Sequence, residues 1–294
     1  MNKQKDKMNK KSILYKGAIV TTLFACMFSC EELENDSETV TGLKSALKVG
    51  IDTAAHDLSQ KDGYLADAAV KIGVPDEAAT TFKAINYLSS NSLCKAALTA
   101  AGSNIDGTFE ETLVTLFNRA AEDAAPKSVD VFVSAINKMS ISDGETILFG
   151  ANNAATTYLK TNTYTGLQAA FNPSITASLN TVKVANYTPI SAWKEFATYN
   201  NKLADYITTY VTGNSLTAWT WSSALGDSKY NTVAAVKTVN TNLPDYVTGK
   251  ALDGLFVKVA GKELDIRTNA NARINDVLKK VFGRLDSNSS SSSN

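Results

Sequence analysis

The chain has 294 residues, of which 44% are hydrophobic and 20% are charged, and its formal net charge is zero. Six lysines and one aspartate lie in the first 29 residues, so a chain that begins at Cys30 keeps 23 basic and 28 acidic residues, a net charge of −5. A mildly acidic chain without basic runs argues against nucleic acid as a partner, and its length suffices for one large folded domain.

The first thirty residues resemble a bacterial lipoprotein signal, which ends in a lipid-accepting cysteine. Six lysines, the last of them Lys16, precede an apolar run from Gly17 to Ser29, and Cys30 is followed by Glu31. This run of 13 residues is shorter than the roughly 20 residues of a membrane-spanning helix, which favours a signal segment. We therefore expect residues 1–29 to be a cleaved lipoprotein signal peptide and residues 30–40 to be a flexible acidic tether.

The acylated residue has an alternative. Cys26 follows Leu23-Phe24-Ala25, but cleavage there would leave Met27 and Phe28 at the mature end. An uncleaved anchor and a plain signal peptide are two further interpretations. With Cys30 acylated, by palmitate or a similar chain, several acyl chains would attach the protein stably to a membrane. We expect a place in the cell envelope, at the periplasmic or surface face of the outer membrane rather than in the inner membrane.

Helical periodicity dominates the chain after residue 40. After Thr108, apolar residues recur every three or four positions from Phe109 to Ala124, as on one face of a helix. Similar patterns predict helices near residues 40–58, 76–89, 126–137, 152–159, 163–171, 174–185, 191–203, 252–260 and 274–282. We predict an all-α fold, a compact multi-helix bundle that forms a single domain over residues 41–284, with a disordered serine-asparagine tail at 285–294.

One stretch departs from this pattern. Residues 206–212 and 215–221 are rich in β-branched and aromatic residues, and they flank Gly213-Asn214. That arrangement is typical of two strands joined by a two-residue turn, so we predict a small β-hairpin insertion near residues 206–221. A continuation of helix is the alternative, because an isolated hairpin is only marginally stable.

Residues that commonly form metal centres or disulfides are few. His56 is the one histidine, and we expect it at the surface of the first helix. Cys94 is the remaining thiol once Cys26 is removed and Cys30 is acylated, so we expect a small buried apolar group and no disulfide within the chain. The sequence predicts no metal site and no cofactor.

The best catalytic match is Ser-x-x-Lys, the nucleophile-and-base spacing of penicillin-recognising serine enzymes. Its occurrences include Ser45/Lys48 and Ser191/Lys194. Such spacing arises often by chance, and the Lys-Thr-Gly strand that should accompany it is missing. We therefore predict no catalytic residue, and keep Ser191 with Lys194, or paired carboxylates, as an alternative.

Two groups of residues suggest binding surfaces. Polar residues on the helix faces form the first group, a candidate polar binding face made of Asn118, Arg119, Glu122, Lys250 and Asp253. These charges, like those of Glu263 and Arg267, could equally be solvated pairs worth roughly 0.2–0.5 kcal/mol each. The second group is Trp219 and Trp221, which would share one face of a strand and stack against a ligand if that face were open.

Several blocks of sequence, in the same order, resemble the uncharacterised bacterial family known as domain of unknown function 4197. The blocks include Gly42–Leu47, Asp62–Leu65, Lys71–Pro75, Asn118–Pro126, Met139–Asp143, Ala154–Leu159 and Asp245–Phe256. The resemblance covers roughly residues 41–283 and implies a helical envelope protein, commonly exported, with no assigned activity, cofactor or partner. The chain departs from the family's pattern at Gly144, where alanine is expected, and between Tyr206 and Asn242, where we expect it to be longer.

Three hypotheses about function remain at this point. The first is a lipid-anchored, non-catalytic binding or structural protein of the cell envelope, in contact with the membrane through its acyl chains and with an unknown envelope ligand or protein. The second is an envelope hydrolase or acyltransferase. The third is a glycan- or lipid-binding protein that uses Trp219 and Trp221.

Overall fold

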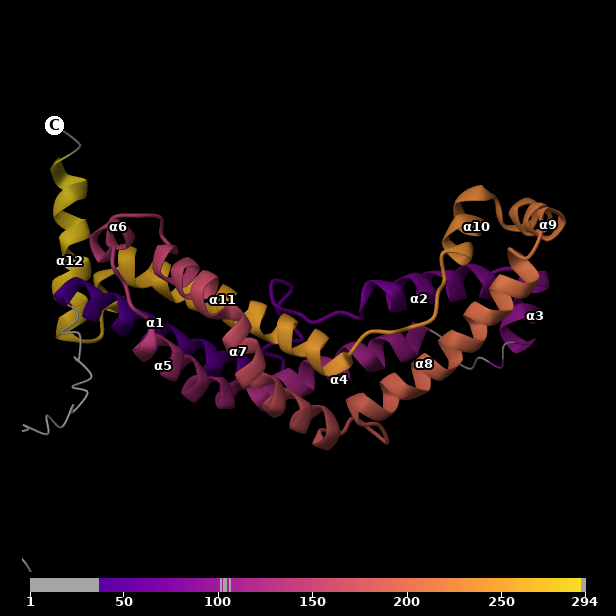
Figure 1. The fold of residues 1–294 in the computed structure, drawn as a ribbon, viewed down its shortest axis with the longest axis horizontal. Helices are drawn as coiled ribbons and strands as arrows, with labels where there is room; N and C mark the ends of the chain where they lie inside the picture. The colour runs from indigo at the N-terminus through magenta and orange to yellow at the C-terminus, as the bar shows by residue number, and fades with distance from the viewer. Residues whose placement is uncertain (1–36, 101, 103–104, 106, 292–294) are drawn as a thin grey trace, which may run out of the picture. The chain divides into compact units, whose positions relative to one another are not determined.

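The computed structural model describes residues 37–291, apart from residues 101, 103, 104 and 106. The predicted signal peptide and Cys30 lie outside these residues. The described part of the chain is all-α, as predicted (Figure 1). Its one element of β pairing is an antiparallel bridge between Val184 and Tyr187.

The α-helices are α1 (Glu38–Ser59), α2 (Asp76–Ser89), α3 (Ser92–Ala100), α4 (Gly107–Ala124), α5 (Ser128–Lys138), α6 (Gly144–Leu148), α7 (Ala154–Thr181), α8 (Pro189–Tyr206), α9 (Ser215–Leu225), α10 (Asp227–Ala234), α11 (Leu243–Thr268) and α12 (Asp276–Ser291). Three short helical segments accompany them: the 3-10 helices η1 (Ala125–Lys127) and η3 (Ala270–Ala272), and the π-helix η2 (Ile207–Val211). α12 extends as helix into the stretch expected to be a tail.

α11 is the helix around which the core forms. It runs beside both α1 and α7, and these two pairs make the most extensive helix contacts of the described structure (Figure 1). Because neighbours cover α11 on more than one side, its buried residues are not confined to a narrow stripe; they include Val247, Leu252 and Val259. Burial of each such side chain contributes about 1.5–3 kcal/mol.

α1 begins at a side-chain cap and buries one continuous face. The Ser37 hydroxyl accepts from the N–H of Val40 at 3.3 Å and so satisfies one of the free donors of the first turn. On the same helix Gly42 lies against α12, where an added Cβ would come within 2.6 Å of Val281. A larger residue at this position would force the two helices apart.

α7 is one continuous helix where three were predicted, and the predicted breaks around Pro173 are wrong. Proline inside a helix removes the donor to the carbonyl of residue 169 and costs about 3 kcal/mol. Leu167, Phe171, Ile175 and Leu179 are nearly or fully buried on both sides of the proline. Their burial at helical spacing outweighs the lost hydrogen bond.

The predicted β-hairpin is also wrong: η2 and α9 make residues 207–211 and 215–225 helical, and residues 212–214 connect them. Gly213 ends a helical segment rather than a strand, because a Cβ there would lie 2.3 Å from the carbonyl oxygen of Thr209. Asn214 then caps α9: its side chain accepts from the N–H of Thr217 at 3.0 Å, and Thr217 Oγ1 accepts from the N–H of Asn214 at 3.2 Å. The Gly-Asn pair therefore separates two helical segments, so the alternative of a continued helix is right about the helical state but not about the break.

Ion pairs connect α12 to its neighbours. Arg284 binds both carboxylate oxygens of Glu145 on α6, and the Thr39 hydroxyl donates to Glu145 at 2.6 Å. Arg273, which is buried, binds Asp286 through two hydrogen bonds of 2.5 and 2.9 Å. The Arg273 hydrogen bonds also lower the pKa of Asp286. Paired contacts of this kind fix direction as well as distance.

Stability from the Glu145–Arg284 pair should be present at neutral pH and lost on acidification. The hydrogen bonds from Arg284 and Thr39 lower the pKa of Glu145 from 4.5 to about 2. A carboxylate with a depressed folded-state pKa stabilises above its unfolded pKa, and that contribution disappears as the pH falls from about 4.5 to about 2. We expect urea unfolding across this range to show a shallower pH dependence in Arg284→Met than in the wild type.

The matched control is Lys279→Met, because Lys279 pairs with the fully exposed Asp276 and should leave the wild-type pH dependence unchanged. Identical pH dependence in Arg284→Met and the wild type would contradict the assigned role of the pair.

Candidate functional site

Asn118, the first residue of the predicted polar binding face, is fully buried and holds the connection between α1 and α2. Its side-chain amide donates to the carbonyls of Ile72 at 2.8 Å and Val114 at 2.7 Å, and its Oδ1 accepts from the N–H of Ile72 at 2.9 Å. The side-chain amide therefore bonds to both the N–H and the C=O of Ile72, as the backbone of a neighbouring β-strand would. Asn118 fastens the connection to α4.

Glu122 lies one turn further along α4 and binds the same connection. Only 5% of this residue is exposed. Its Oε1 accepts from the N–H groups of Tyr64 and Leu65 at 3.2 and 3.3 Å, and its Oε2 accepts from Arg119 at 2.5 Å. Arg119 also reaches Asp62 at 2.5 Å. A buried carboxylate is stable only with such partners, so this group has a structural function.

Tyr64 joins this cluster to α11. The side chain is fully buried, and its hydroxyl donates to the carbonyl of Ala251 at 2.9 Å. Burial raises the pKa of Tyr64, and the nearby carboxylate of Glu122 raises it further. Gly254 leaves room for the ring, because a Cβ at that position would lie 2.7 Å from the Tyr64 ring. We call this cluster the α4–α11 joint; it comprises Asn118, Arg119 and Glu122 of α4, residues 62–72, and Ala251 and Gly254 of α11.

The remaining residues of the predicted polar face, Lys250 and Asp253, lie on α11 and contact residues outside the joint. Asp253 accepts from Lys160 at 2.8 Å and from the hydroxyl of Tyr164 at 3.3 Å, both on α7. The ammonium of Lys250 lies 5.7 Å from the centre of the Tyr246 ring. The five residues therefore do not form one face: Asn118, Arg119 and Glu122 brace the joint, Asp253 links α11 to α7, and Lys250 contacts its own helix.

Glu263 and Arg267, for which the sequence left a solvated pair and a polar groove open, form a buried ion pair at 2.8 Å. The Glu263 carboxylate accepts from the N–H groups of Ala155 and Thr156, at 3.0 and 2.7 Å, in the first turn of α7. Arg267 donates to the last carbonyl of α6, that of Leu148, at 2.6 Å. A negative group at a helix N-terminus and a positive group at a C-terminus both oppose the local dipole charge favourably.

The spacing of Glu263 and Arg267 along the chain could have indicated their burial. Glu263 and Arg267 continue the spacing of the buried residues Val259 and Ile266 along α11. Polar residues within an apolar stripe are buried with it, and they then need partners from other elements.

The two tryptophans differ in environment because their segment is helical. Residues two apart point in directions about 200° apart on a helix, whereas on a strand they would share a face. Trp219 is 68% exposed. Trp221 packs against the core and its indole N–H donates to the carbonyl of Tyr210 at 3.0 Å. A stacking surface that uses both rings is therefore absent from α9.

The two Ser-x-x-Lys serines have structural partners. Ser191 forms a capping box at the start of α8: its hydroxyl accepts from the N–H of Thr188 and donates to the carbonyl of that residue, both at 2.9 Å. Ser45 accepts from the side chain of Asn275 at 3.2 Å, where α12 begins against α1. Their spacing with Lys194 and Lys48 follows from helix geometry and does not by itself make a nucleophile.

His56 is exposed in the last turn of α1, and Cys94 is buried in α3, where burial raises the pKa of its thiol. Over the described residues, no three His, Cys, Asp or Glu side chains gather closely enough to hold a metal ion. The helices of the same residues include none with the length and apolar character needed to cross a bilayer.

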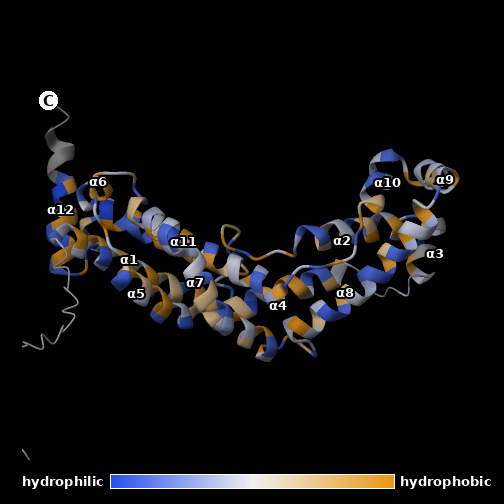
Figure 2. Ribbon diagram, viewed as in Figure 1, coloured by the Kyte–Doolittle hydropathy of each residue, from blue (hydrophilic) through white to orange (hydrophobic). Residues whose placement is uncertain are grey.

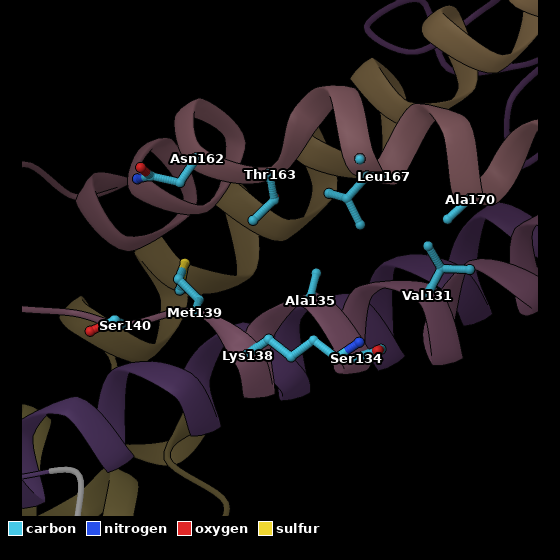
Figure 3. A pocket seen from close by; sticks show the side chains of 11 residues that line it. Val131, Ser134, Ala135, Lys138, Met139, Ser140, Asn162, Thr163, Leu167 and Ala170 are labelled. Atoms are coloured by element: carbon cyan, nitrogen blue, oxygen red, sulfur yellow. The ribbon is translucent and has the colours of Figure 1, made fainter. Parts of the chain in front are cut away.

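A groove of about 490 Å³ lies between α5 and α7. Figure 3 shows side chains from the two helices facing each other across it. Leu167, Val131 and Met139 supply apolar surface, while Lys138 and Asn162 add polar groups. A surface of this kind suits an extended, partly apolar ligand. Sequence reasoning did not identify the groove, because its lining comes from two helices whose pairing is tertiary.

Comparison with known families assigns the chain to a group. Residues 34–220 and 219–283 match the family model described as protein of unknown function (DUF4197). The chain belongs to the DUF4197 family. No curated protein and no solved structure matches it.

Four of the blocks of sequence that resemble DUF4197 meet at the α4–α11 joint. Asp62–Leu65 and Lys71–Pro75 supply the connection, Asn118–Pro126 supplies the side chains that hold it, and Asp245–Phe256 includes Ala251 and Gly254. These four segments, far apart in the chain, thus lie in one packed cluster. In this DUF4197 protein Asn118 and Glu122 bind the protein's own backbone, and Arg119 binds the side chains of Glu122 and Asp62.

Asn118→Asp should destabilise the protein by about 2–4 kcal/mol. The substitution keeps the size of the side chain and the acceptor for Ile72 N–H, but it replaces two donors with a carboxylate oxygen facing two carbonyls. The free energy of unfolding, measured by urea titration at neutral pH, tests this.

Asn180→Asp is the matched control. Asn180 makes the same kind of intrahelical bond, to the carbonyl of Thr176 at 2.7 Å, but it is exposed. Its substitution should change stability by no more than about 0.5 kcal/mol. Equal effects of the two substitutions would contradict the role assigned to Asn118.

Proposed function

We propose that this DUF4197 protein is a lipid-anchored protein of the cell envelope whose helical body serves as a non-catalytic binding or structural module. The observation that carries the proposal is the N-terminal pattern of six lysines, a 13-residue apolar run and Cys30 followed by acidic residues. A cysteine in this position accepts a diacylglycerol before cleavage, and several acyl chains hold a protein stably at a membrane. The short run favours a cleaved signal over a spanning helix.

The arrangement of polar groups supports a module without catalysis. Asn118, Glu122 and Glu263 all bind backbone groups of the protein itself, which stabilises the fold and leaves these side chains committed. Ser191, the serine of the alternative hydrolase or acyltransferase, is likewise engaged in a helix cap. A catalytic nucleophile needs a base within hydrogen-bond reach and an open approach for the substrate.

The grooves between helices offer the surface on which such a module would bind. The groove between α5 and α7 combines an apolar floor with Lys138 at its side. An envelope ligand with an apolar body and a negative group would be complementary to it. The acidic residues that follow Cys30 favour the outer membrane, at its periplasmic or surface face.

Cys30→Ser should prevent lipidation and processing when the full-length protein is expressed in a bacterial host. We expect wild-type protein to incorporate labelled palmitate and to lose residues 1–29, whereas Cys30→Ser remains an unlabelled precursor. Globomycin, which blocks cleavage of lipoprotein signals, should make wild-type protein accumulate as precursor. Mass spectrometry of the N-terminal peptide provides the direct measurement.

Cys26→Ser is the control, because the proposal predicts normal processing of this variant. Labelling that depends on Cys26 would move the anchor to that residue. An unmodified peptide that spans Met27 to Asn35 in mature wild-type protein would contradict the anchor altogether.

A further inference from the structure

The segment from Tyr206 to Gly226 contains no Lys, Arg, Asp or Glu, although one residue in five of the whole chain is charged. Asp205 and Asp227 lie directly outside it. The segment includes the last residue of α8, η2 and α9. None of the residues of α9 is buried, so this helix is neither charged like a solvated surface helix nor covered like a core helix.

Three large side chains of this segment are exposed. Leu216 is 72% exposed, Trp219 is 68% exposed and Tyr210 is 57% exposed. Leu216 and Trp219 are three residues apart and therefore lie on the same side of α9. Figure 2 shows α9 mostly in pale and orange tones beside α10, which carries blue residues. We call these three residues, Tyr210 of η2 with Leu216 and Trp219 of α9, the α9 patch.

Several hydroxyl groups near the patch are bonded internally. Thr217 and Thr220 donate to the carbonyls of Asn214 and Leu216 at 2.9 and 2.8 Å. The hydroxyl of Thr212 bonds to the carbonyl of Ile207 at 3.4 Å. A Ser or Thr hydroxyl that donates to a carbonyl of its own helix has no free donor to offer a ligand. Ser and Thr residues of membrane helices bond in the same way.

These features favour a lipid surface over a sugar. A sugar site needs free donors and acceptors beside the aromatic ring, and here several of the neighbouring donors, including the indole N–H of Trp221, are already bonded. The uncharged segment is complementary to the boundary between lipid headgroups and acyl chains, where each inserted charge is costly. Tryptophan and tyrosine are enriched at that boundary because their rings are amphipathic.

We propose that α9 is a second membrane contact, at which Leu216, Trp219 and Tyr210 insert into the interfacial layer of a phospholipid bilayer. The inference rests on the proposed function in one respect: acylation of Cys30 would hold the protein near the bilayer that α9 meets. The helix needs no ordering on contact, because the capping box of Asn214 and Thr217 and its packing on α10 and η2 already fix it. A preformed helix loses little conformational entropy on binding.

Flotation with phosphatidylcholine vesicles tests the proposal without the acyl anchor. The chain from Glu31 onward keeps every residue of the described core, which runs from Val40 to Phe282. At about 0.15 M salt, this unacylated chain should float with the vesicles. The double substitution Leu216→Asn/Trp219→Asn should lower the partition coefficient about tenfold or more.

Ile274→Asn is the matched control, because Ile274 is 66% exposed on a different part of the chain and its loss should leave flotation unchanged. Circular dichroism verifies that all variants are folded. Vesicles should also shift the tryptophan emission of the unsubstituted chain to shorter wavelength, and Trp219→Phe should remove this shift while Trp221→Phe should keep it.

Other outcomes overturn the proposal. Insertion by α9 is contradicted if the unsubstituted chain from Glu31 onward does not float, or if it floats no better than the double variant. Neither result bears on the proposed acylation, because Cys30 is absent from the experiment. Binding to soluble glycans that depends on Trp219 and occurs without vesicle binding makes the patch a sugar site. A dimer in sedimentation that the double variant abolishes makes it an interface between copies.

Discussion

The fold depends on how the irregular connection between α1 and α2 is satisfied inside the protein. This connection has no helix of its own, so its buried N–H and C=O groups need partners from elsewhere. Asn118 and Glu122 of α4 supply them, and the connection then presents Tyr64 to α11. Gly63 makes the turn into the connection possible, because a Cβ there would lie 2.5 Å from the carbonyl oxygen of Asp57. α1, α4 and α11 are thereby held in one arrangement.

The sequence predicts the features of the fold that are local. Spacing of apolar residues gives α1, α2, α4 and α8 close to their observed bounds, because a helix that buries one face must repeat that face every three or four residues. Turn chemistry is weaker evidence, since Gly213-Asn214 fits a hairpin and a helix boundary equally well. The interior of α7 could not be predicted, because the compensation for Pro173 comes from tertiary burial.

The candidate site shows the same division between local and tertiary information. The sequence identified Asn118, Arg119 and Glu122 as polar residues on a helix face, but their partners in residues 62–72 lie more than 45 residues away and only the structure supplies them. The sequence could not choose between a solvated pair and a polar groove for Glu263 and Arg267, since the helix ends that they cap belong to α7 and α6. A polar side chain reveals its role only through the group that it binds.

Polar groups that are bonded internally mark the scaffold of the described structure, and exposed apolar surface marks its candidate contact regions. The α4–α11 joint uses its polar groups internally, whereas the α5–α7 groove and the α9 patch leave apolar surface exposed. A DUF4197 protein of this design would present fixed contact surfaces from a rigid interior. Preorganised surfaces bind with a smaller entropy cost than surfaces that must order first.

The most direct test of this account is native-state amide hydrogen exchange at Tyr64, Leu65 and Ile72. The N–H groups of these residues donate to Glu122 and Asn118 and lie in a connection that has no helical bonds to protect it. The account predicts exchange as slow as that of the central amides of α11, because all of them open only when the whole fold unfolds. Exchange at the rate of an exposed loop would show that the joint does not hold the fold together.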